Sequence, residues 1–287
     1  MRILEILKVI LLGIVEGITE WLPISSTGHI LLFDTVFPLY ISERPEAFME
    51  IFKVVIQLGA IVAVIVLFWR KLFPVIVEKK DRKLAFNADM AILNLWGKVI
   101  IGCLPAAVFG LLLDDFLEQY LQTPLVISLT LIIYGVIFIL IENKNKNRVF
   151  DIQSTDQLTY KQAFLIGLFQ VLALIPGTSR SGATIIGALL IGVARPVGAE
   201  FTFYLAIPVM LGASALKVLK FLLEFGMFTG VEFGYILLAM AVAFIVSMLA
   251  IKFLMNFVKK NDFKPFGWYR IILGAVVIAT LVLPAML

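Results

Sequence analysis

The sequence predicts an all-α integral membrane protein with about six transmembrane helices and two re-entrant helical hairpins in an inverted repeat. Composition, the lengths of the apolar runs and the charges of the loops predict this fold. Of 287 residues, 61% are hydrophobic and 15% are charged, and the mean hydropathy is +1.04. Apolar runs of about 20 residues cross a hydrocarbon core roughly 30 Å thick. The composition excludes a soluble globular domain, and the basic residues lie in loops between apolar runs, so we expect no nucleic-acid binding.

Six apolar runs are long enough to cross a bilayer, and four shorter ones form two pairs. The long runs cover residues 47–69, 91–113, 123–141, 200–223, 233–257 and 267–286. The first short pair covers about 3–22 and 30–39, and the second about 163–175 and 183–193. Pro23 interrupts the first pair and Pro176 the second, and each proline ends a helix. Each pair therefore predicts a re-entrant hairpin, whose non-helical tip must be buried in protein or line a cavity.

The second half of the chain repeats the plan of the first. We expect a single membrane domain over 1–287, with internal repeats at about 1–145 and 155–287. An offset of 154 residues, the separation of Ser25 from Ser179, aligns the two short pairs. The same offset pairs Gly13 with Gly167, Glu16 with Gln170, and Gly28 with Gly182.

Loop charges alternate from one crossing to the next. Basic residues gather in the loops at 70–83, 144–161 and 259–264, and acidic residues in those at 114–118 and 224–232. The positive-inside rule places basic loops in the cytoplasm, so both termini should lie outside it. With three crossings in each half, the halves are then inverted, and broken helices in such repeats meet near the midplane.

Polar residues gather at the break of the first hairpin. Glu16 and Glu20 lie four residues apart, on one face of a helix. Paired carboxylates in an apolar setting suit a divalent cation, Mg²⁺ or Ca²⁺, or an acid–base pair; a hydrogen-bonded structural pair is the alternative. Ser25, Ser26 and Thr27 offer hydroxyls and backbone N–H groups where the next helix begins, which suits phosphate binding as well as capping.

His29 is the only histidine of the chain, and it lies two positions after Thr27. A histidine beside carboxylates suits proton transfer, and the alternative is a packed structural side chain.

The second break carries a cation between serines. Arg180 lies between Ser179 and Ser181, and Thr184 follows one helical turn later. A guanidinium in an apolar setting needs an anion, and its planar fork binds a phosphate through two hydrogen bonds. The alternative is a structural ion pair of Arg180 with one of the two glutamates.

Together the breaks supply carboxylates, hydroxyls, an acid–base group and an anion clamp, which indicates phosphoryl transfer within a membrane. Gln57 and Glu200 are further polar positions within or beside long apolar runs, and we expect them to line the cavity of the site.

Both polar segments closely resemble the signature motifs of the undecaprenyl-pyrophosphate phosphatases of the bacitracin-resistance type. The motifs read Glu16-Gly-Ile-Thr-Glu20 with Pro23-Ile-Ser-Ser-Thr-Gly-His29, and Pro176-Gly-Thr-Ser-Arg-Ser-Gly-Ala-Thr184. The resemblance covers essentially the whole chain. It implies a multi-pass protein of the bacterial plasma membrane that hydrolyses undecaprenyl pyrophosphate to undecaprenyl phosphate and phosphate, recycling the cell-wall lipid carrier.

The resemblance also implies roles for individual residues. Glu16 and Glu20 match the family's acidic pair, which serves divalent-metal dependence and catalysis, Ser26 a catalytic hydroxyl and His29 the acid–base group. The pyrophosphate-binding set is matched by Ser179, Arg180 and Thr184. The attacking group is Ser26, His29 or a water; because the chain lacks the second histidine of the two-histidine lipid phosphatases, we favour Ser26 or water.

The expected partners are a polyprenyl diphosphate substrate and membrane lipid, with a homodimer left open. Inverted repeats with broken helices are also transporter architecture, so the alternative function is a transporter or flippase for a polyprenyl phosphate carrier.

Overall fold

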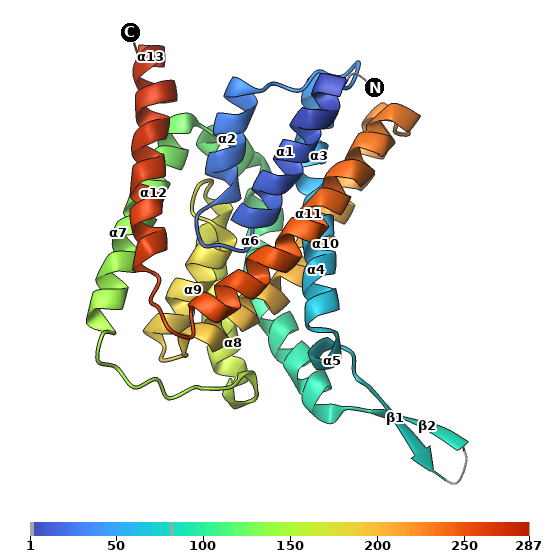
Figure 1. Cartoon of the computed structure of the whole chain (residues 1–287), viewed down its shortest axis with the longest axis vertical. Helices are drawn as coiled ribbons and strands as arrows, with labels where there is room; N and C mark the ends of the chain where they lie inside the picture. The colour runs from blue at the N-terminus through green and yellow to red at the C-terminus, as the bar shows by residue number, and fades with distance from the viewer. Residues whose placement is uncertain (1–2, 81–82, 287) are drawn as a thin grey trace.

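The computed structural model describes residues 3–80 and 83–286, which form a bundle of helices with one β-hairpin beside it (Figure 1). The elements of the first half are α1 (Ile3–Thr19), α2 (Ser26–Val36), α3 (Pro45–Val55), α4 (Gln57–Leu67), α5 (Trp69–Leu72), β1 (Val75–Lys80), β2 (Lys83–Ala88), α6 (Met90–Leu121) and α7 (Pro124–Lys144). Those of the second half are η1 (Thr155–Gln157), α8 (Tyr160–Val171), η2 (Leu172–Leu174), α9 (Arg180–Leu190), α10 (Arg195–Phe225), α11 (Gly230–Phe257), α12 (Lys264–Val277), η3 (Ile278–Val282) and α13 (Leu283–Met286).

Within the described ranges, six helical segments are long and apolar enough to cross a membrane, which confirms the predicted number. They cover Pro45–Leu67, Met90–Leu113, Pro124–Lys144, Arg195–Phe225, Gly230–Phe257 and Lys264–Ala285. Large apolar side chains stay exposed on the outside of the bundle, among them Leu112 at 75% and Leu223 at 80%. An apolar outer surface of this extent suits lipid rather than water.

The bundle is helical as predicted, and the hairpin of β1 and β2 is an addition that we did not predict. It joins α5 to α6 and pairs antiparallel from Val75 with Ala88 to Lys80 with Lys83. Val75, Ile76 and Val77 form a β-branched run, which favours an extended backbone. The hairpin projects from one end of the bundle and takes no part in its core (Figure 1).

Two helix pairs are too short to cross a membrane, as the prolines at their breaks predict. The pair α1–α2 and the pair α8–α9 each turn back at their break, and α2 and α9 both have 11 residues. In Figure 1 the two breaks point toward each other from opposite ends of the bundle. A re-entrant path through the bilayer and the internal repeat stay predictions.

Close backbone contacts fix each short pair against a long helix. A Cβ at Gly17 would lie 2.9 Å from the carbonyl oxygen of Ala243, which ties α1 to α11. A Cβ at Gly167 would lie 2.1 Å from the carbonyl oxygen of Gly102, which ties α8 to α6. Any side chain at Gly167 would force these helices apart, so the position of the second break depends on this glycine.

The ends of the bundle differ in charge. The ends of the described chain lie together at one end, and the loops at 144–161 and 259–264 lie at the other, with the β-hairpin (Figure 1). The predicted segregation of basic loops is therefore present in three dimensions. The orientation of these two ends in a membrane stays a prediction.

Candidate active site

Each helix break ends in a serine with an unusual backbone. Ser25 has φ of 74° and Ser179 has φ of 68°, and these are the non-glycine residues with positive φ in the described part of the chain. Residues other than glycine rarely adopt this region, and such strain gathers at functional sites. Ser25 precedes α2 and Ser179 precedes α9, so each serine sets the direction in which a short helix starts.

Arg270 of α12 joins the two breaks. Its Nη1 donates to the carbonyl oxygen of Pro23 at 3.3 Å, and its Nη2 donates to those of Gly177 and Thr178 at 2.9 Å each. The side chain is fully buried. One guanidinium therefore holds the non-helical backbone of both hairpins at a single place.

Glu20 of the first break and Arg180 of the second break form an ion pair. Arg180 Nη2 donates to Glu20 Oε1 at 3.0 Å, and its Nη1 donates to the carbonyl oxygen of Thr202 on α10 at 3.0 Å. The pair is nearly buried, with 11% of the Arg180 side chain exposed. In this arrangement Arg180 forms the ion pair that we considered as the alternative. A guanidinium has five N–H donors, so a phosphate can bind Arg180 without displacing Glu20.

Glu20 also accepts a hydrogen bond from Ser26. The hydroxyl of Ser26 donates to Glu20 Oε2 at 3.1 Å, while Oε1 of the same carboxylate faces Arg180. A carboxylate that accepts the proton of a hydroxyl is the arrangement of a general base with its nucleophile. Glu20 thus connects the proton-bearing hydroxyl of one break to the cation of the other.

His29 lies beside this chain of contacts and bonds elsewhere. Its Nδ1 lies 2.7 Å from the carbonyl oxygen of Ser25, and its Nε2 lies 2.7 Å from the hydroxyl of Tyr269. The bond to a carbonyl requires an N–H on Nδ1, so in the neutral ring Nε2 accepts from Tyr269. The rings of His29 and Tyr269 are stacked, with centroids 5.5 Å apart. In this arrangement the partner of the Ser26 hydroxyl is Glu20 rather than His29.

Glu16 is fully buried one helical turn before Glu20, and neither oxygen of its carboxylate has a hydrogen-bond partner. A buried carboxylate without a partner is costly unless it is protonated or binds a cation. The described residues contain no group of three His, Cys, Asp or Glu side chains that could hold a metal ion. Glu16 and Glu20 therefore suit a cation whose remaining ligands are phosphate oxygens and water, as is common for Mg²⁺.

Hydroxyls of the second break shape the start of α9. Ser179 Oγ accepts from the backbone N–H of Gly182 at 3.2 Å and lies 3.1 Å from Ser181 Oγ, which donates to the carbonyl oxygen of Glu20 at 3.3 Å. The buried hydroxyl of Thr184 lies 2.8 Å from that of Thr202, so it fastens α9 to α10. This geometry gives Thr184 a positioning role beside the predicted pyrophosphate set.

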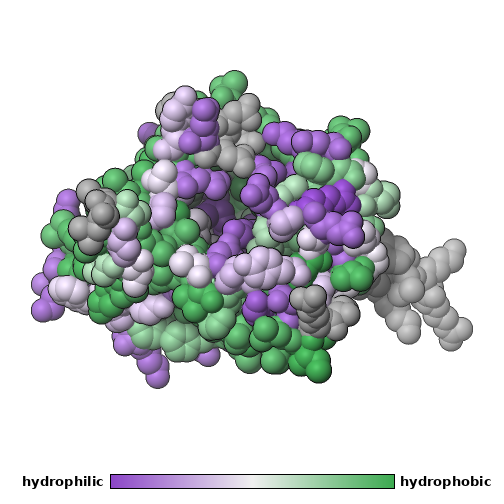
Figure 2. Space-filling model, turned by 90° about the horizontal axis from the view of Figure 1, so that it is seen from above, coloured by the Kyte–Doolittle hydropathy of each residue, from purple (hydrophilic) through white to green (hydrophobic). Residues whose placement is uncertain are grey.

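A cavity of about 720 Å³ leads to the first break. Ser26, Thr27 and Gln57 line it, together with Pro176 of the second break. Ser26 both lines the cavity and donates a hydrogen bond to Glu20. A ligand in the cavity would therefore lie next to the Glu20–Arg180 ion pair. Figure 2, seen from the end where the termini lie, shows a hollow near the centre of this face with hydrophilic residues around it. Gln57, a candidate from the sequence, is among the residues that line this cavity.

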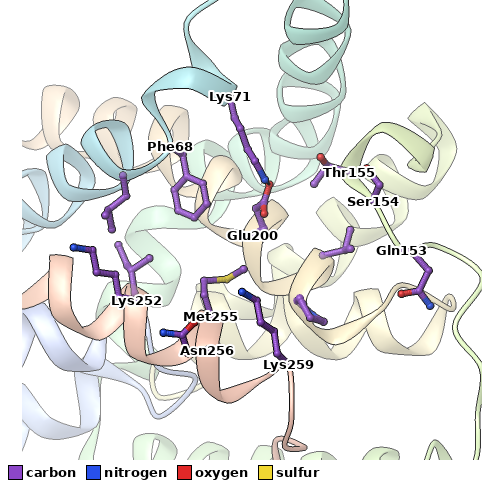
Figure 3. A pocket seen from close by; sticks show the side chains of 14 residues that line it. Phe68, Lys71, Gln153, Ser154, Thr155, Glu200, Lys252, Met255, Asn256 and Lys259 are labelled. Atoms are coloured by element: carbon purple, nitrogen blue, oxygen red, sulfur yellow. The ribbon is translucent and has the colours of Figure 1, made fainter.

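Glu200 lies elsewhere, although we predicted it in the same cavity. It lines a different cavity, where Figure 3 shows it beside Lys71. Its carboxylate accepts hydrogen bonds from Lys71 and Tyr204. The reason is helical geometry: Thr202 is two positions after Glu200, a rotation of roughly 200° about the helix axis, so the two residues face different sides of α10.

Three residues of the site lie outside both sequence motifs: Arg270, Tyr269 and Thr202. Arg270 interrupts the last apolar run, and an arginine inside such a run is itself a signal of a buried polar site. Tyr269 is its neighbour in the same run. Thr202 acts through its backbone oxygen toward Arg180 and through its hydroxyl toward Thr184, and neither contact is visible in a local side-chain pattern.

The fold and the site define a class: a polytopic membrane protein with a buried carboxylate, hydroxyl and guanidinium at the meeting of two broken helix pairs. The chain belongs to the bacitracin resistance protein BacA family, whose model matches residues 9–276.

Three relatives show how far the similarity extends. A protein of Enterococcus faecalis named undecaprenyl-diphosphatase is 58% identical over 275 residues, which cover 96% of each chain. A protein of the same name from Desulfitobacterium hafniense is 54% identical over 279 residues, 97% of this chain and 96% of its own. One from Latilactobacillus sakei is 48% identical over 283 residues, 99% of this chain and all of its own.

Proposed function

We propose that this chain hydrolyses undecaprenyl pyrophosphate to undecaprenyl phosphate and phosphate, which recycles the lipid carrier of cell-wall synthesis. Its membership of the family and the name that its full-length relatives share support this activity. The structural observation that carries the chemistry is the carboxylate of Glu20, which bonds to Ser26 on one side and to Arg180 on the other.

The diphosphate binds between the two breaks. Arg180 supplies the N–H donors that its bonds to Glu20 and Thr202 leave over. The start of α2 supplies further donors, because Ser25 makes no side-chain capping bond and the first N–H groups of a helix lack intrahelical partners. Positive charge from both sides neutralises the equatorial oxygens as the phosphoryl group transfers.

Glu20 acts as the general base. It takes the proton of Ser26, or of a water that Ser26 holds, as that oxygen attacks the terminal phosphorus. The bond from this phosphorus to the bridging oxygen breaks, and undecaprenyl phosphate leaves with the bridging oxygen. If Ser26 attacks, a water then cleaves the phosphoserine and releases phosphate. His29 positions the break through the carbonyl oxygen of Ser25, and its role as acid–base group stays a prediction.

A divalent cation, Mg²⁺ or Ca²⁺, is part of the proposal. Glu16 and Glu20 would hold it, because the Glu16 oxygens are buried without partners. When bound, the cation supplies charge neutralisation for the phosphate oxygens.

The location that best fits the charges is the bacterial plasma membrane, with the basic loops in the cytoplasm and the termini outside. The cavity that contains Ser26 then opens outward, because residues of the α2–α3 loop and Gln122, which follows α6, also line it. The polyprenyl tail stays in the surrounding lipid. The transporter alternative gains no support from the relatives, and a homodimer stays a prediction.

Phosphate release from undecaprenyl pyrophosphate by the purified protein in detergent tests the activity. Replacing Ser26 by Ala should lower the rate roughly 10²-fold or more, because the variant loses the hydroxyl that Glu20 holds. Phosphoserine trapped by acid quench with labelled substrate would identify Ser26 as the nucleophile. No phosphate release by the wild-type protein, with lipid movement across vesicle membranes, would contradict the proposal and favour the transporter.

A further inference from the structure

A second cavity, of about 490 Å³, lies at the end of the bundle that carries the basic loops. Figure 3 shows it between α5, the start of α10, the last turns of α11 and the loop that leads into η1. Nothing in the proposed hydrolysis uses this cavity. Its lining combines lysines with neutral hydrogen-bond donors, including Ser154, Thr155 and Asn256, over an apolar wall that contains Phe68.

The cavity has an excess of positive charge. Lys71, Lys252 and Lys259 line it, against one carboxylate, that of Glu200. Lys252 lies on α11 and Lys259 in the turn that follows its C-cap Val258, and among the described residues neither makes an ion pair. In Figure 3 Lys71 reaches into the cavity from α5 and Lys259 from the turn after α11, with Glu200 between them.

The one carboxylate is already neutralised. Glu200 Oε1 accepts from Lys71 Nζ at 2.7 Å and from the hydroxyl of Tyr204 at 2.6 Å. Tyr204 is fully buried and Glu200 is 9% exposed, so these two groups form the floor of the cavity, and the largely exposed Lys71 lies over them. The charges of Lys252 and Lys259 are then left to attract an anion.

The first turn of α10 adds to this potential. Pro196 and Val197 line the cavity, and α10 starts there with no side-chain cap. The uncapped N-terminus of a helix carries a partial positive charge and favours phosphate-like anions.

Aromatic side chains place the cavity at the depth of lipid headgroups. Trp69 and Phe73 flank Lys71, are about half exposed, and stack with ring centroids 4.5 Å apart. Exposed Trp next to basic residues is typical of the membrane–water interface.

We propose that this cavity binds a phosphate group, either the headgroup of an anionic membrane lipid or inorganic phosphate. Lys252 and Lys259 attract it, the neutral donors around η1 and on α11 orient it, and Phe68 offers an apolar wall to an attached chain. The active site is on another face of α10, so the two sites are separate.

The test compares Lys252→Gln/Lys259→Gln with a matched control, Lys146→Gln/Lys260→Gln, in the purified full-length protein. The control removes two exposed lysines from the same end of the bundle but outside the cavity. One arm measures retention of phosphatidylglycerol against phosphatidylcholine by native mass spectrometry. The other titrates inorganic phosphate in an Arg180→Lys background, so that the active site contributes less.

We expect binding in at least one arm to weaken roughly tenfold in the cavity variant and to stay unchanged in the control. Loss of lipid retention identifies a headgroup, and loss of phosphate binding identifies the free ion. Wild-type binding in both arms, or equal losses in variant and control, overturns the proposal. Hydrolysis by both double variants should equal that of the wild type, which shows that they fold and keeps this test independent of the proposed function.

Glu200→Gln tests the sign of the charge effect. Removing the only carboxylate should strengthen binding of the same probe, roughly threefold to tenfold, which misfolding cannot imitate. Weaker binding by a variant of normal thermal stability would contradict the proposal.

Discussion

The two helix breaks share a backbone device but differ in how the serine side chain is used. Ser25 and Ser179 both have positive φ, and each begins a helix of 11 residues. Ser179 caps its helix by accepting from Gly182 N–H, whereas the hydroxyl of Ser25 is buried without a partner. The second break therefore satisfies its own helix N-terminus and positions the Arg180 guanidinium. The first break leaves the backbone N–H groups at the start of α2 for a ligand.

The breaks also differ in charge at equivalent positions. Glu16 precedes the first break and Gln170 the second, in positions related by the 154-residue offset. Both are buried, and both have side-chain polar atoms without partners. One is a carboxylate and the other a neutral amide, so a cation site can form on one side only. Similar local folds thus carry complementary chemistry, and each half alone lacks part of the site.

The largest effect should come from Glu20, which joins the halves. Glu20→Gln keeps the size of the side chain but loses the base and the ion pair with Arg180, so phosphate release should fall by roughly 10³-fold or more at every Mg²⁺ concentration.

Glu16→Gln makes the first half resemble the second, and it should instead raise the Mg²⁺ concentration required for half-maximal rate. An Mg²⁺ dependence unchanged in Glu16→Gln would contradict the metal role of Glu16.

Arg270 tests whether one side chain holds both breaks. Arg270→Met leaves the carbonyl oxygens of Pro23, Gly177 and Thr178 buried without a donor, which should lower the free energy of unfolding by about 3 kcal/mol. Thermal unfolding and phosphate release in the same detergent measure the loss.

The matched control is Arg44→Met, because Arg44 also donates to two backbone carbonyls, those of Phe225 and Met227, at a partly exposed site. Water can replace those bonds, so the control should lose less stability. Equal losses in the two variants would show that burial of Arg270 adds nothing.

Arg180→Lys tests whether the guanidinium of the second break binds phosphate or only forms an ion pair with Glu20. Lysine keeps the charge but cannot bind Glu20, the Thr202 carbonyl and a phosphate at once through a planar fork. We expect the rate to fall roughly 10²-fold, with a thermal stability close to that of the wild type. Hydrolysis at the wild-type rate would show that Arg180 is a structural ion pair and not a phosphate ligand.

Particular residues show what the sequence could and could not predict. The long helices followed from apolar runs, and the breaks followed from Pro23 and Pro176, because both signals are local. The ion pair of Arg180 with one of the two glutamates was only the alternative to phosphate binding, because the sequence shows that each group needs a partner but not which one it finds. The roles of Arg270 and Tyr269 depend on where α12 packs, and the place of Glu200 depends on the rotation of α10. Those are tertiary properties, which no local pattern carries.

We expect the smallest effect for the two serines that precede α2 and α9, Ser25 and Ser179, and it is a difference in stability. Ser179→Ala removes the cap of α9 and should lower the free energy of unfolding by about 1 kcal/mol. Ser25→Ala removes a hydroxyl without a partner from a residue of similar backbone strain, so it should change stability less. Thermal unfolding of both variants in one detergent measures the difference, and the shared positive φ cancels the strain of alanine between them. A larger loss of stability in Ser25→Ala would show that the Ser25 hydroxyl also caps its helix. The two breaks would then differ in their charges alone.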